Sequence, residues 1–202
     1  MSAGELIPTD GLEAMDMLPL PMKTARMGAS GNSIQGFLGP TRWRLMVRTS
    51  WLTLAEARVW DPWIWNRIHN GETFTAWRLN RLAPAGALGT ADGSIGITVD
   101  KPNSQISLTG TGAYVASKGD MISYRTDVNG YCLVMVMADA TAVAGAVTLN
   151  VFPRPLDKHA SAPAVRRAQA LGEFELAPGT DLAPFDDYTG RQIQFEAIQV
   201  LR

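Results

Sequence analysis

The sequence predicts a mainly β fold of the α+β class, an antiparallel β-sandwich or split barrel that carries one capped helix, plus a small inserted β-barrel-like domain. Three observations lead to this prediction. All six tryptophans lie between Trp43 and Trp77, in a stretch patterned as strand, capped helix and strand. Short alternating segments, separated by turn residues, follow from residue 105 onward. The last residues of the chain alternate again, as a closing strand does.

Three parts are expected in the chain. Residues 1–34 mix proline, glycine, methionine and small polar residues without a clear period, which predicts an extended N-terminal arm that has room for one strand near residues 18–27. Residues 35–82 and 185–202 are predicted to form one β domain, which contains the helix. Residues 83–184 are predicted to form an inserted small β domain with loops, because a stretch rich in glycine, alanine and proline follows residue 82.

The first strand is predicted from residue 41 onward. Trp43, Leu45 and Val47 alternate there with arginines and a methionine, which is the period of a strand with one buried face. A second strand is expected after Gly71, over residues 73–79, because apolar and polar residues alternate again.

Between these strands the sequence predicts a helix over residues 54–69. Thr53 and Glu56 have the spacing of a capping box, in which each side chain binds a free backbone amide of the first turn. Gly71 supplies the left-handed residue that often ends a helix. Pro62 lies inside this pattern and lacks a backbone N–H, so we expect a kink, or two shorter helices, near residues 60–62.

The middle of the chain is predicted to form short strands that build a small barrel or sandwich. These strands cover residues 105–109, 121–125, 131–138 and 147–152. The alanine-rich stretch 138–144 is interpreted as a hairpin loop, since it is too short to hold a helix alone. Residues 159–171 are expected to form a short helix or a loop. Residues 191–201 are predicted to be a strand that pairs with the first unit.

Composition limits the classes of function. The chain has 18 Lys plus Arg against 19 Asp plus Glu, a formal charge of -1, so no overall field attracts nucleic acid or anionic membranes. The single cysteine, Cys132, excludes an internal disulfide and a cysteine-built metal site. We expect no signal peptide and no membrane insertion, because the longest apolar run, residues 131–138, is far shorter than the roughly 20 residues of a spanning helix.

Few residues suit catalysis or a cofactor. His69 lies near a helix end, where interaction with the helix dipole is the simpler explanation, and His159 lies far from it in a predicted loop. Cys132 sits in an apolar strand, where cysteine usually acts as a small hydrophobe. Asp186 and Asp187 fit a solvated turn better than a cation site. We therefore predict that the protein is not an enzyme and has no catalytic residue, cofactor or metal.

The aromatic and basic residues point to a contact surface. Trp60, Trp63 and Trp65 cannot all face one side of a helix, and tryptophan is enriched at the centres of interfaces. Packing is expected to explain about four of the tryptophans. Arg44 and Arg48 lie on the polar face of the first strand, which is assigned to solvent or an interface. The candidate interface residues are Trp63, Trp65, Arg44 and Arg48.

Several segments share a pattern with a known family. They are Trp43-Arg44-Leu45, Thr53-Leu54-Ala55-Glu56-Ala57-Arg58 with Trp60, Gly71-Glu72-Thr73-Phe74, Lys118-Gly119-Asp120, and Asn150-Val151-Phe152-Pro153-Arg154-Pro155-Leu156. Together they resemble minor tail proteins of long-tailed bacteriophages, in particular the distal tail protein class. Members of that class have a β-rich belt domain with a helix, often with an inserted or appended β domain. Pro62 inside the helix departs from the pattern.

The resemblance implies a structural virion protein that forms an oligomeric ring, commonly a hexamer, between the tail tube and the tail tip or baseplate. Its implied partners are further copies of itself, the tail tube protein and the tail hub or tip proteins, with DNA only as cargo through a central channel. The implied location is the virion tail, after synthesis in the bacterial host cytoplasm. Deleting residues 1–30 is expected to weaken assembly and leave the core folded.

The alternative is a carbohydrate-binding β module of a tail tip or cell-surface protein, whose aromatic side chains stack on sugars. Binding to a glycan array separates the two hypotheses, because a connector is expected to bind no glycan.

Overall fold

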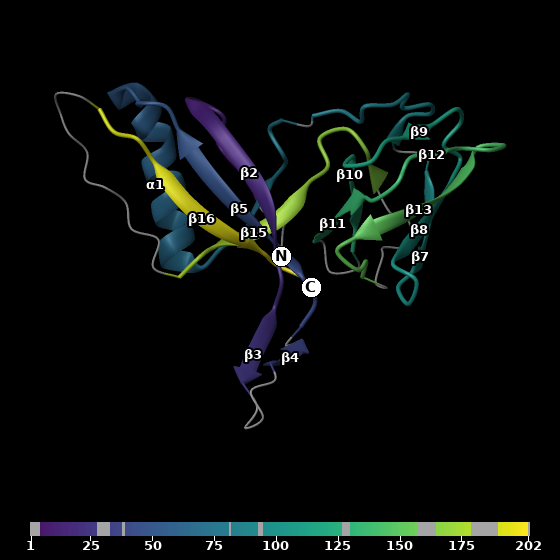
Figure 1. The fold of residues 1–202 in the computed structure, drawn as a ribbon. Coiled ribbons are helices and arrows are strands. Elements are labelled where there is room, and N and C mark those ends of the chain that lie inside the picture. The colour runs from purple at the N-terminus through teal and green to yellow at the C-terminus, as the bar shows by residue number, and fades with distance from the viewer. Residues whose placement is uncertain are drawn as a thin grey trace.

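A computed structural model describes residues 5–27, 33–37, 39–80, 82–92, 95–126, 130–156, 165–178 and 190–201. In these residues the protein is mainly β with one α-helix, and its strands form two six-stranded and two two-stranded sheets (Figure 1). The predicted fold class, antiparallel β with one capped helix, is confirmed. The described residues contain no helix long and apolar enough to cross a membrane.

The first sheet brings together strands from the beginning, middle and end of the chain, in the order β1-β6-β15-β16-β5-β2. Its strands are β1 (Glu5–Leu6), β2 (Leu12–Leu20), β5 (Arg42–Thr49), β6 (Phe74–Ala76), β15 (Gly172–Leu176) and β16 (Gln194–Gln199). The last strand, β16, is antiparallel to β5, with Phe195 opposite Val47. The expected pairing of the C-terminal strand with the first unit is therefore present.

Residues 5–20 belong to this sheet, although the sequence assigns them to an extended arm. β2 pairs with β5 in antiparallel orientation, and β1 pairs with β6 in parallel. Ile7, Met15 and Met17 are buried in the core. Proline interrupts the apolar period of this segment, and Pro19 is tolerated in β2 because edge strands need not donate every backbone N–H.

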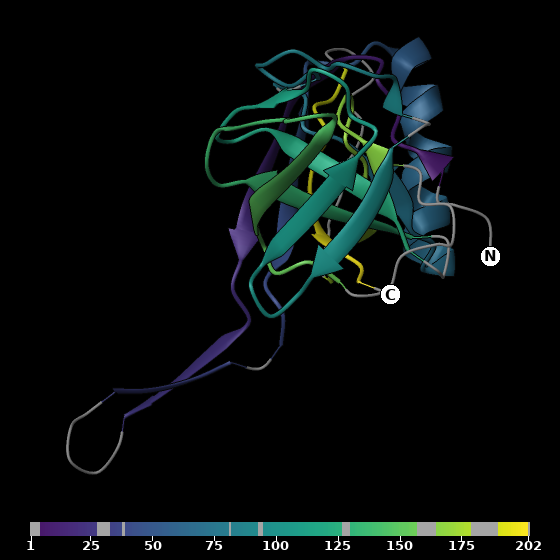
Figure 2. The same cartoon turned by 90° about the vertical axis from the view of Figure 1, so that its right-hand side faces the viewer.

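Beyond β2 the chain forms a hairpin of β3 (Lys23–Met27) and β4 (Ser33–Phe37) before it enters β5. The two strands are antiparallel, and neither pairs with another strand in the described part of the chain. Figure 2 shows the hairpin projecting from the body of the molecule. Of the described residues in the predicted arm, those of this hairpin are the ones that project from the body of the molecule.

β15 also lies in the first sheet, although the sequence places it within the insert 83–184. It is antiparallel to both β6 and β16. The ring of Phe174 lies 6.1 Å from that of Phe74, both fully buried. The chain therefore returns to the first sheet at residue 172. How it divides into domains stays a prediction.

The helix α1 (Leu54–Asn70) covers one face of the first sheet (Figure 1). Its capping box is present: Thr53 N–H donates to the Glu56 carboxylate at 2.8 Å, and Glu56 N–H donates to the Thr53 hydroxyl at 3.4 Å. Gly71 ends the helix with φ 60°. The capping residues therefore act as the sequence predicts.

Pro62 does not divide α1, so of the two expected alternatives the division into two shorter helices is excluded, while the kink stays a prediction. Pro62 lies on the exposed side of the helix, away from the sheet. Trp60 and Ile64, on either side of it, are fully buried. We infer that their packing offsets the loss of one helical hydrogen bond, which typically amounts to about 3 kcal/mol with the associated clash.

The second sheet has the strand order β14-β10-β11-β13-β8-β7. Its strands are β7 (Gly96–Asp100), β8 (Gln105–Thr109), β10 (Met121–Arg125), β11 (Tyr131–Val136), β13 (Ala146–Phe152) and β14 (Val165–Arg166). β9 (Val115–Ala116) pairs with β12 (Ala140–Thr141) beside it.

Two alternatives from the sequence are decided in this region. The alanine-rich stretch 138–144 contains β12 and ends in a tight turn at Ala144 and Gly145, both with positive φ. It is a hairpin loop, as interpreted. Residues 165–166 of the stretch 159–171 form β14, so this part is strand and not helix, while residues 157–164 lie outside the described residues.

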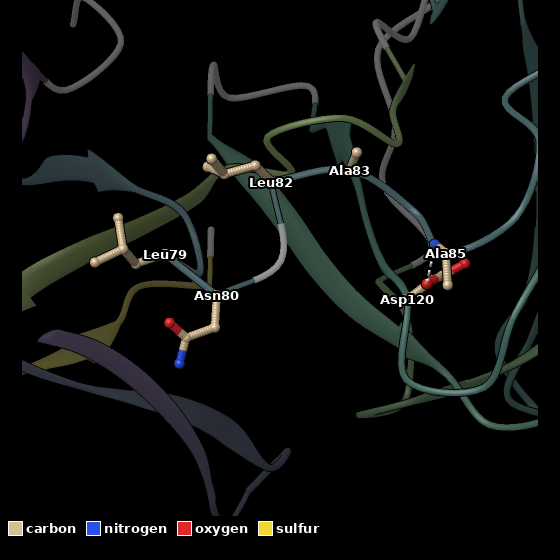
Figure 3. A pocket seen from close by; sticks show the side chains of 6 residues that line it. All are labelled: Leu79, Asn80, Leu82, Ala83, Ala85 and Asp120. Atoms are coloured by element: carbon tan, nitrogen blue, oxygen red, sulfur yellow. Dashed lines mark hydrogen bonds between the residues drawn. The ribbon is translucent and has the colours of Figure 1, made fainter.

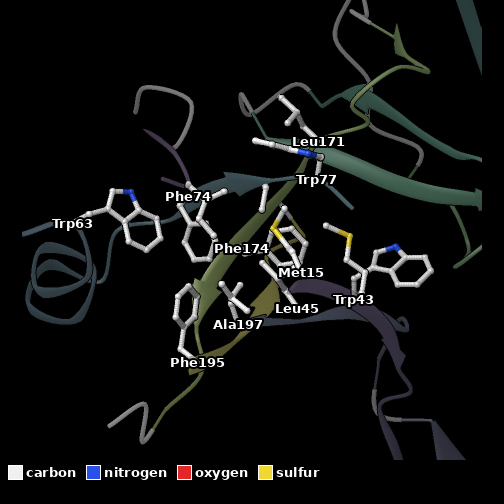
Figure 4. Packing of buried hydrophobic residues seen from close by; sticks show 14 of the residues in the cluster. Met15, Trp43, Leu45, Trp63, Phe74, Trp77, Leu171, Phe174, Phe195 and Ala197 are labelled. Carbon is white, nitrogen blue, oxygen red and sulfur yellow. The ribbon is translucent and has the colours of Figure 1, made fainter. Parts of the chain in front are cut away.

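The two sheets share a packed boundary, because β10 and β11 contribute to two cores. Met121 and Leu133 belong to the core of the first sheet, part of which is shown in Figure 4. Ile122 and Val134, on the opposite face of the same strands, belong to the core of the second sheet. Trp43 of β5 donates its indole N–H to the Leu133 carbonyl at 2.9 Å, which ties the sheets together.

Candidate functional site

The residues weighed for catalysis do not form a site in the part of the chain that the structure describes. There, no group of three or more His, Cys, Asp or Glu side chains is placed to hold a metal ion. His69 is exposed in the last turn of α1. His159, Asp186 and Asp187 lie outside the described residues.

Cys132 is buried in β11, in the core of the second sheet. Burial raises the pKa of its thiol. Because the thiolate is the reactive form, this position does not suit a nucleophile. The structure therefore supports the interpretation of Cys132 as a small core side chain.

A pocket of about 510 Å³ lies beside the segment that follows β6 (Figure 3). It is lined by Leu79, Asn80, Leu82, Ala83, Ala85 and Asp120. The Asp120 carboxylate accepts hydrogen bonds from Ala85 N–H at 3.0 Å and Ser117 N–H at 2.8 Å. Both oxygens are bound to backbone, so Asp120 positions the loop and does not offer a free base.

Arg167 is a buried cation that the sequence analysis did not single out. Its guanidinium donates to Asp92 at 2.8 Å and to the Leu88 carbonyl at 2.5 Å, and also bonds the Thr90 carbonyl. It lies over the Tyr114 ring, 4.6 Å from its centroid. These contacts fasten residues 88–92 to the second sheet, and they depend on partners about 75 residues away that no local pattern reveals.

The tryptophans divide as the sequence predicts. Trp43, Trp60, Trp63 and Trp77 are buried in the core of the first sheet. Trp65 is 59% exposed on the outer side of α1, and Trp51, just before the helix, is 65% exposed. Trp63 is only 6% exposed. Of the two tryptophans proposed for an interface, Trp65 is therefore the one that is open to a partner.

Arg44 and Arg48 lie on the face of β5 opposite to Trp43 and Leu45. Arg44 is 3.8 Å from Glu196, and Arg48 is 3.0 Å from Glu13. Such exposed ion pairs contribute about 0–1 kcal/mol each, so they orient this face more than they stabilise it. The role of these arginines in an interface stays a prediction.

A groove of about 680 Å³ lies between β1 and α1, and we call it the β1–α1 groove. It is lined by Glu5, Leu6, Pro8, Arg58, Val59, Pro62, Trp63 and Asn66. Leu6 and Val59 are 49% and 47% exposed. The Trp63 indole N–H is buried and has no hydrogen-bond partner among the described residues. In Figure 4 this nitrogen points away from the ring of Phe195.

Arg67 holds the walls of the groove together. It is buried, and its guanidinium donates to Glu5 of β1 and to Glu72, each at 2.6 Å. It also lies 5.2 Å from the centroid of the Trp63 ring. Because Arg67 comes from the helix and Glu5 from the strand, the groove is formed before any partner binds.

Comparison of the chain with protein-family models and with curated proteins gave no match. The proposals below therefore rest on the residues and geometry described above and on the resemblance of the sequence segments.

Proposed function

We propose that this protein is a structural subunit of a phage tail, forming a ring that connects the tail tube to the tail tip or baseplate. The observation that carries the proposal is the projecting β3–β4 hairpin (Figure 2). An isolated two-stranded hairpin is at best marginally stable in water. A second surface that covers it supplies the missing contacts, and a ring neighbour is such a surface.

The exposed aromatic residues support association as well. Trp65 on α1 and Trp51 just before it remain exposed, and tryptophan is among the side chains that contribute most to interface energies. In the proposed assembly the partners are further copies of the chain, the tail tube protein and the hub or tip proteins. DNA passes only as cargo through the channel, and the location is the virion tail.

Electron microscopy of the concentrated protein tests the ring. Closed rings with a central channel are expected. A variant in which Lys23–Phe37 is replaced by a two-residue Asn-Gly turn should lose the rings, while its circular dichroism and thermal midpoint stay close to those of the parent. Deleting residues 1–30 is unsuitable, because β1 and β2 belong to the folded sheet.

Val143→Ser is the matched control for the hairpin variant. Val143 is 78% exposed in a turn of the second sheet, so this change removes exposed apolar surface at a site distant from the hairpin. Rings that persist in the hairpin variant contradict the proposed role of the hairpin. The absence of rings from the parent at all concentrations contradicts the ring itself.

Exposure of Trp51 and Trp65 also favours a second candidate function, a carbohydrate-binding module. Open indole rings stack on the apolar faces of sugars as they do on other flat ligands. A glycan array tests this function. Binding that is lost in both Trp51→Ala and Trp65→Ala supports the module, and an array without binding supports the connector.

A further inference from the structure

We propose that the β1–α1 groove is the site that receives the β3–β4 hairpin of a second copy of this chain. The inference rests on the proposed ring and deepens it by naming the receiving surface. Four features of the described residues carry it: free groups that recognise backbone, apolar walls, the position of donor and acceptor in the sheet, and charge.

The groove offers hydrogen-bonding groups that suit an extended backbone. The Trp63 indole N–H is a buried donor without a partner among the described residues. Pro62 has no N–H, so the Arg58 carbonyl four residues earlier receives no helical hydrogen bond from it, and both residues line the groove. Among the described residues, β1 is an edge strand and pairs only with β6. A strand that enters the groove can bind all three, as in strand addition to a sheet edge.

The walls of the groove are apolar enough to retain such a strand. Leu6 from β1 and Val59 from α1 are both about half exposed, and Pro62 is exposed between them. Each buried aliphatic side chain contributes about 1.5–3 kcal/mol relative to the exposed one. Leu6 and Val59 are only half buried, so a partner that covers them would bury further apolar surface and gain part of this free energy.

The sheet order places the hairpin and the groove at opposite edges. β1 is one edge strand of the first sheet, and β2, which leads into the hairpin, is the other. A hairpin that inserts into the groove of the next copy makes a head-to-tail contact between two different surfaces. Contacts of this kind generate closed rings when the rotation between copies closes.

The charges of the two surfaces are complementary. The hairpin sequence contains Lys23 and Arg26, and residues 17–55 contain no acidic residue. Around the groove, Arg58 is an exposed cation and Arg67 is buried in ion pairs with Glu5 and Glu72; these two glutamates and Glu175 of β15 are exposed in whole or large part. Their carboxylates face solvent with the opposite sign to the hairpin.

Disulfide trapping between two variants that each carry one introduced cysteine tests the inference. Leu6→Cys in one copy is mixed with Ile34→Cys or Gln35→Cys in a second copy that carries a size tag. Two adjacent positions are used because neighbouring residues of a strand point to opposite faces. The native Cys132 is buried and does not compete. We expect a mixed disulfide at least tenfold above that of the control pair with Val143→Cys in place of Leu6→Cys.

A second variant tests whether the contact lies in the groove itself. Val59→Lys introduces into the wall a charge of the same sign as the hairpin and should reduce the yield of mixed disulfide at least tenfold, whereas His69→Lys, exposed beyond the groove lining, should leave it unchanged. Equal yields in Val59→Lys and in His69→Lys overturn the inference.

The combined outcomes separate the site from the ring. Rings in the microscope without a mixed disulfide overturn this docking site and leave the proposed function standing. A mixed disulfide without rings supports the docking site and contradicts the closed ring. The absence of both overturns the two proposals together, and the hairpin then belongs to a different partner.

Discussion

At the scale of single residues, the start of α1 depends on Thr53 and Glu56. Thr53→Ala removes the hydroxyl that accepts from Glu56 N–H, and leaves that amide without its partner. We expect the free energy of unfolding to fall by about 1 kcal/mol, the usual effect of losing an N-cap. Urea denaturation followed by circular dichroism measures it. Arg58→Ala, on the exposed side of the same helix, is the control and should change stability much less.

Tyr114 is expected to make the protein sensitive to alkali. Burial, followed by the charge of Asp120, raises the pKa of Tyr114 to about 12. The unfolded tyrosine ionises near pH 10. Between these values the unfolded state loses a proton that the folded state keeps, so stability falls as pH rises, by at most about 1.4 kcal/mol per pH unit.

Tyr114→Phe tests this pH dependence. The phenol oxygen has no hydrogen-bond partner among the described residues, so the substitution should be nearly neutral at pH 7 and keep the ring beneath Arg167. Urea midpoints between pH 8 and 11 should decline less steeply in the variant. Parallel slopes for variant and parent contradict the assignment.

At the scale of elements, Pro62 is unfavourable for the stability of α1, and a role in binding would explain its presence. Pro62→Ala restores an N–H to the Arg58 carbonyl and should raise the free energy of unfolding by about 1–3 kcal/mol. If the groove binds a strand, the same variant should trap less mixed disulfide, because the carbonyl is no longer free. A variant that is more stable and associates equally well shows that Pro62 has no part in docking.

The strands show where the element-scale prediction succeeds. Residues 105–109 and 121–125 form β8 and β10 with the predicted bounds, because turn residues flank short apolar runs there. β1 and most of β2 escaped prediction, since their partners lie far along the chain and their own period is interrupted. The hairpin loop 138–144 was predictable because its length excludes a helix.

At the scale of the whole molecule, the two sheets are expected to unfold together. Trp43→Phe keeps an aromatic ring and removes the N–H that bonds Leu133 across the boundary. The free energy of unfolding should fall by about 1–3 kcal/mol, because the buried carbonyl loses its donor. The midpoints reported by helix dichroism and by hydrogen exchange in β8 and β13 should shift equally.

Trp77→Phe is the matched control for this prediction. Trp77 is also buried in the first core, and its indole N–H has no partner among the described residues. Its replacement should cost less than that of Trp43. Separate midpoints for the two sheets contradict a shared boundary and indicate independent unfolding of the two cores.

The sequence by itself determined the β-rich class, the capped helix, most short strands and the burial of most tryptophans. These features depend on residues close together in the chain: a capping pair three residues apart, alternation within a strand, a glycine after a helix. The exposed position of Trp65 follows from the same helical geometry.

Only the tertiary structure decided which strands are neighbours and where a partner can bind. The sheet position of β1 and β15, the two-sided packing of β10 and β11, and the β1–α1 groove all join segments distant in sequence. The residues of a strand indicate which of its faces is buried. They do not indicate which strand lies beside it, because every strand offers the same backbone hydrogen-bonding groups to a partner. The Trp63 N–H became a candidate binding group only when the surrounding side chains were in place and none of them accepted it.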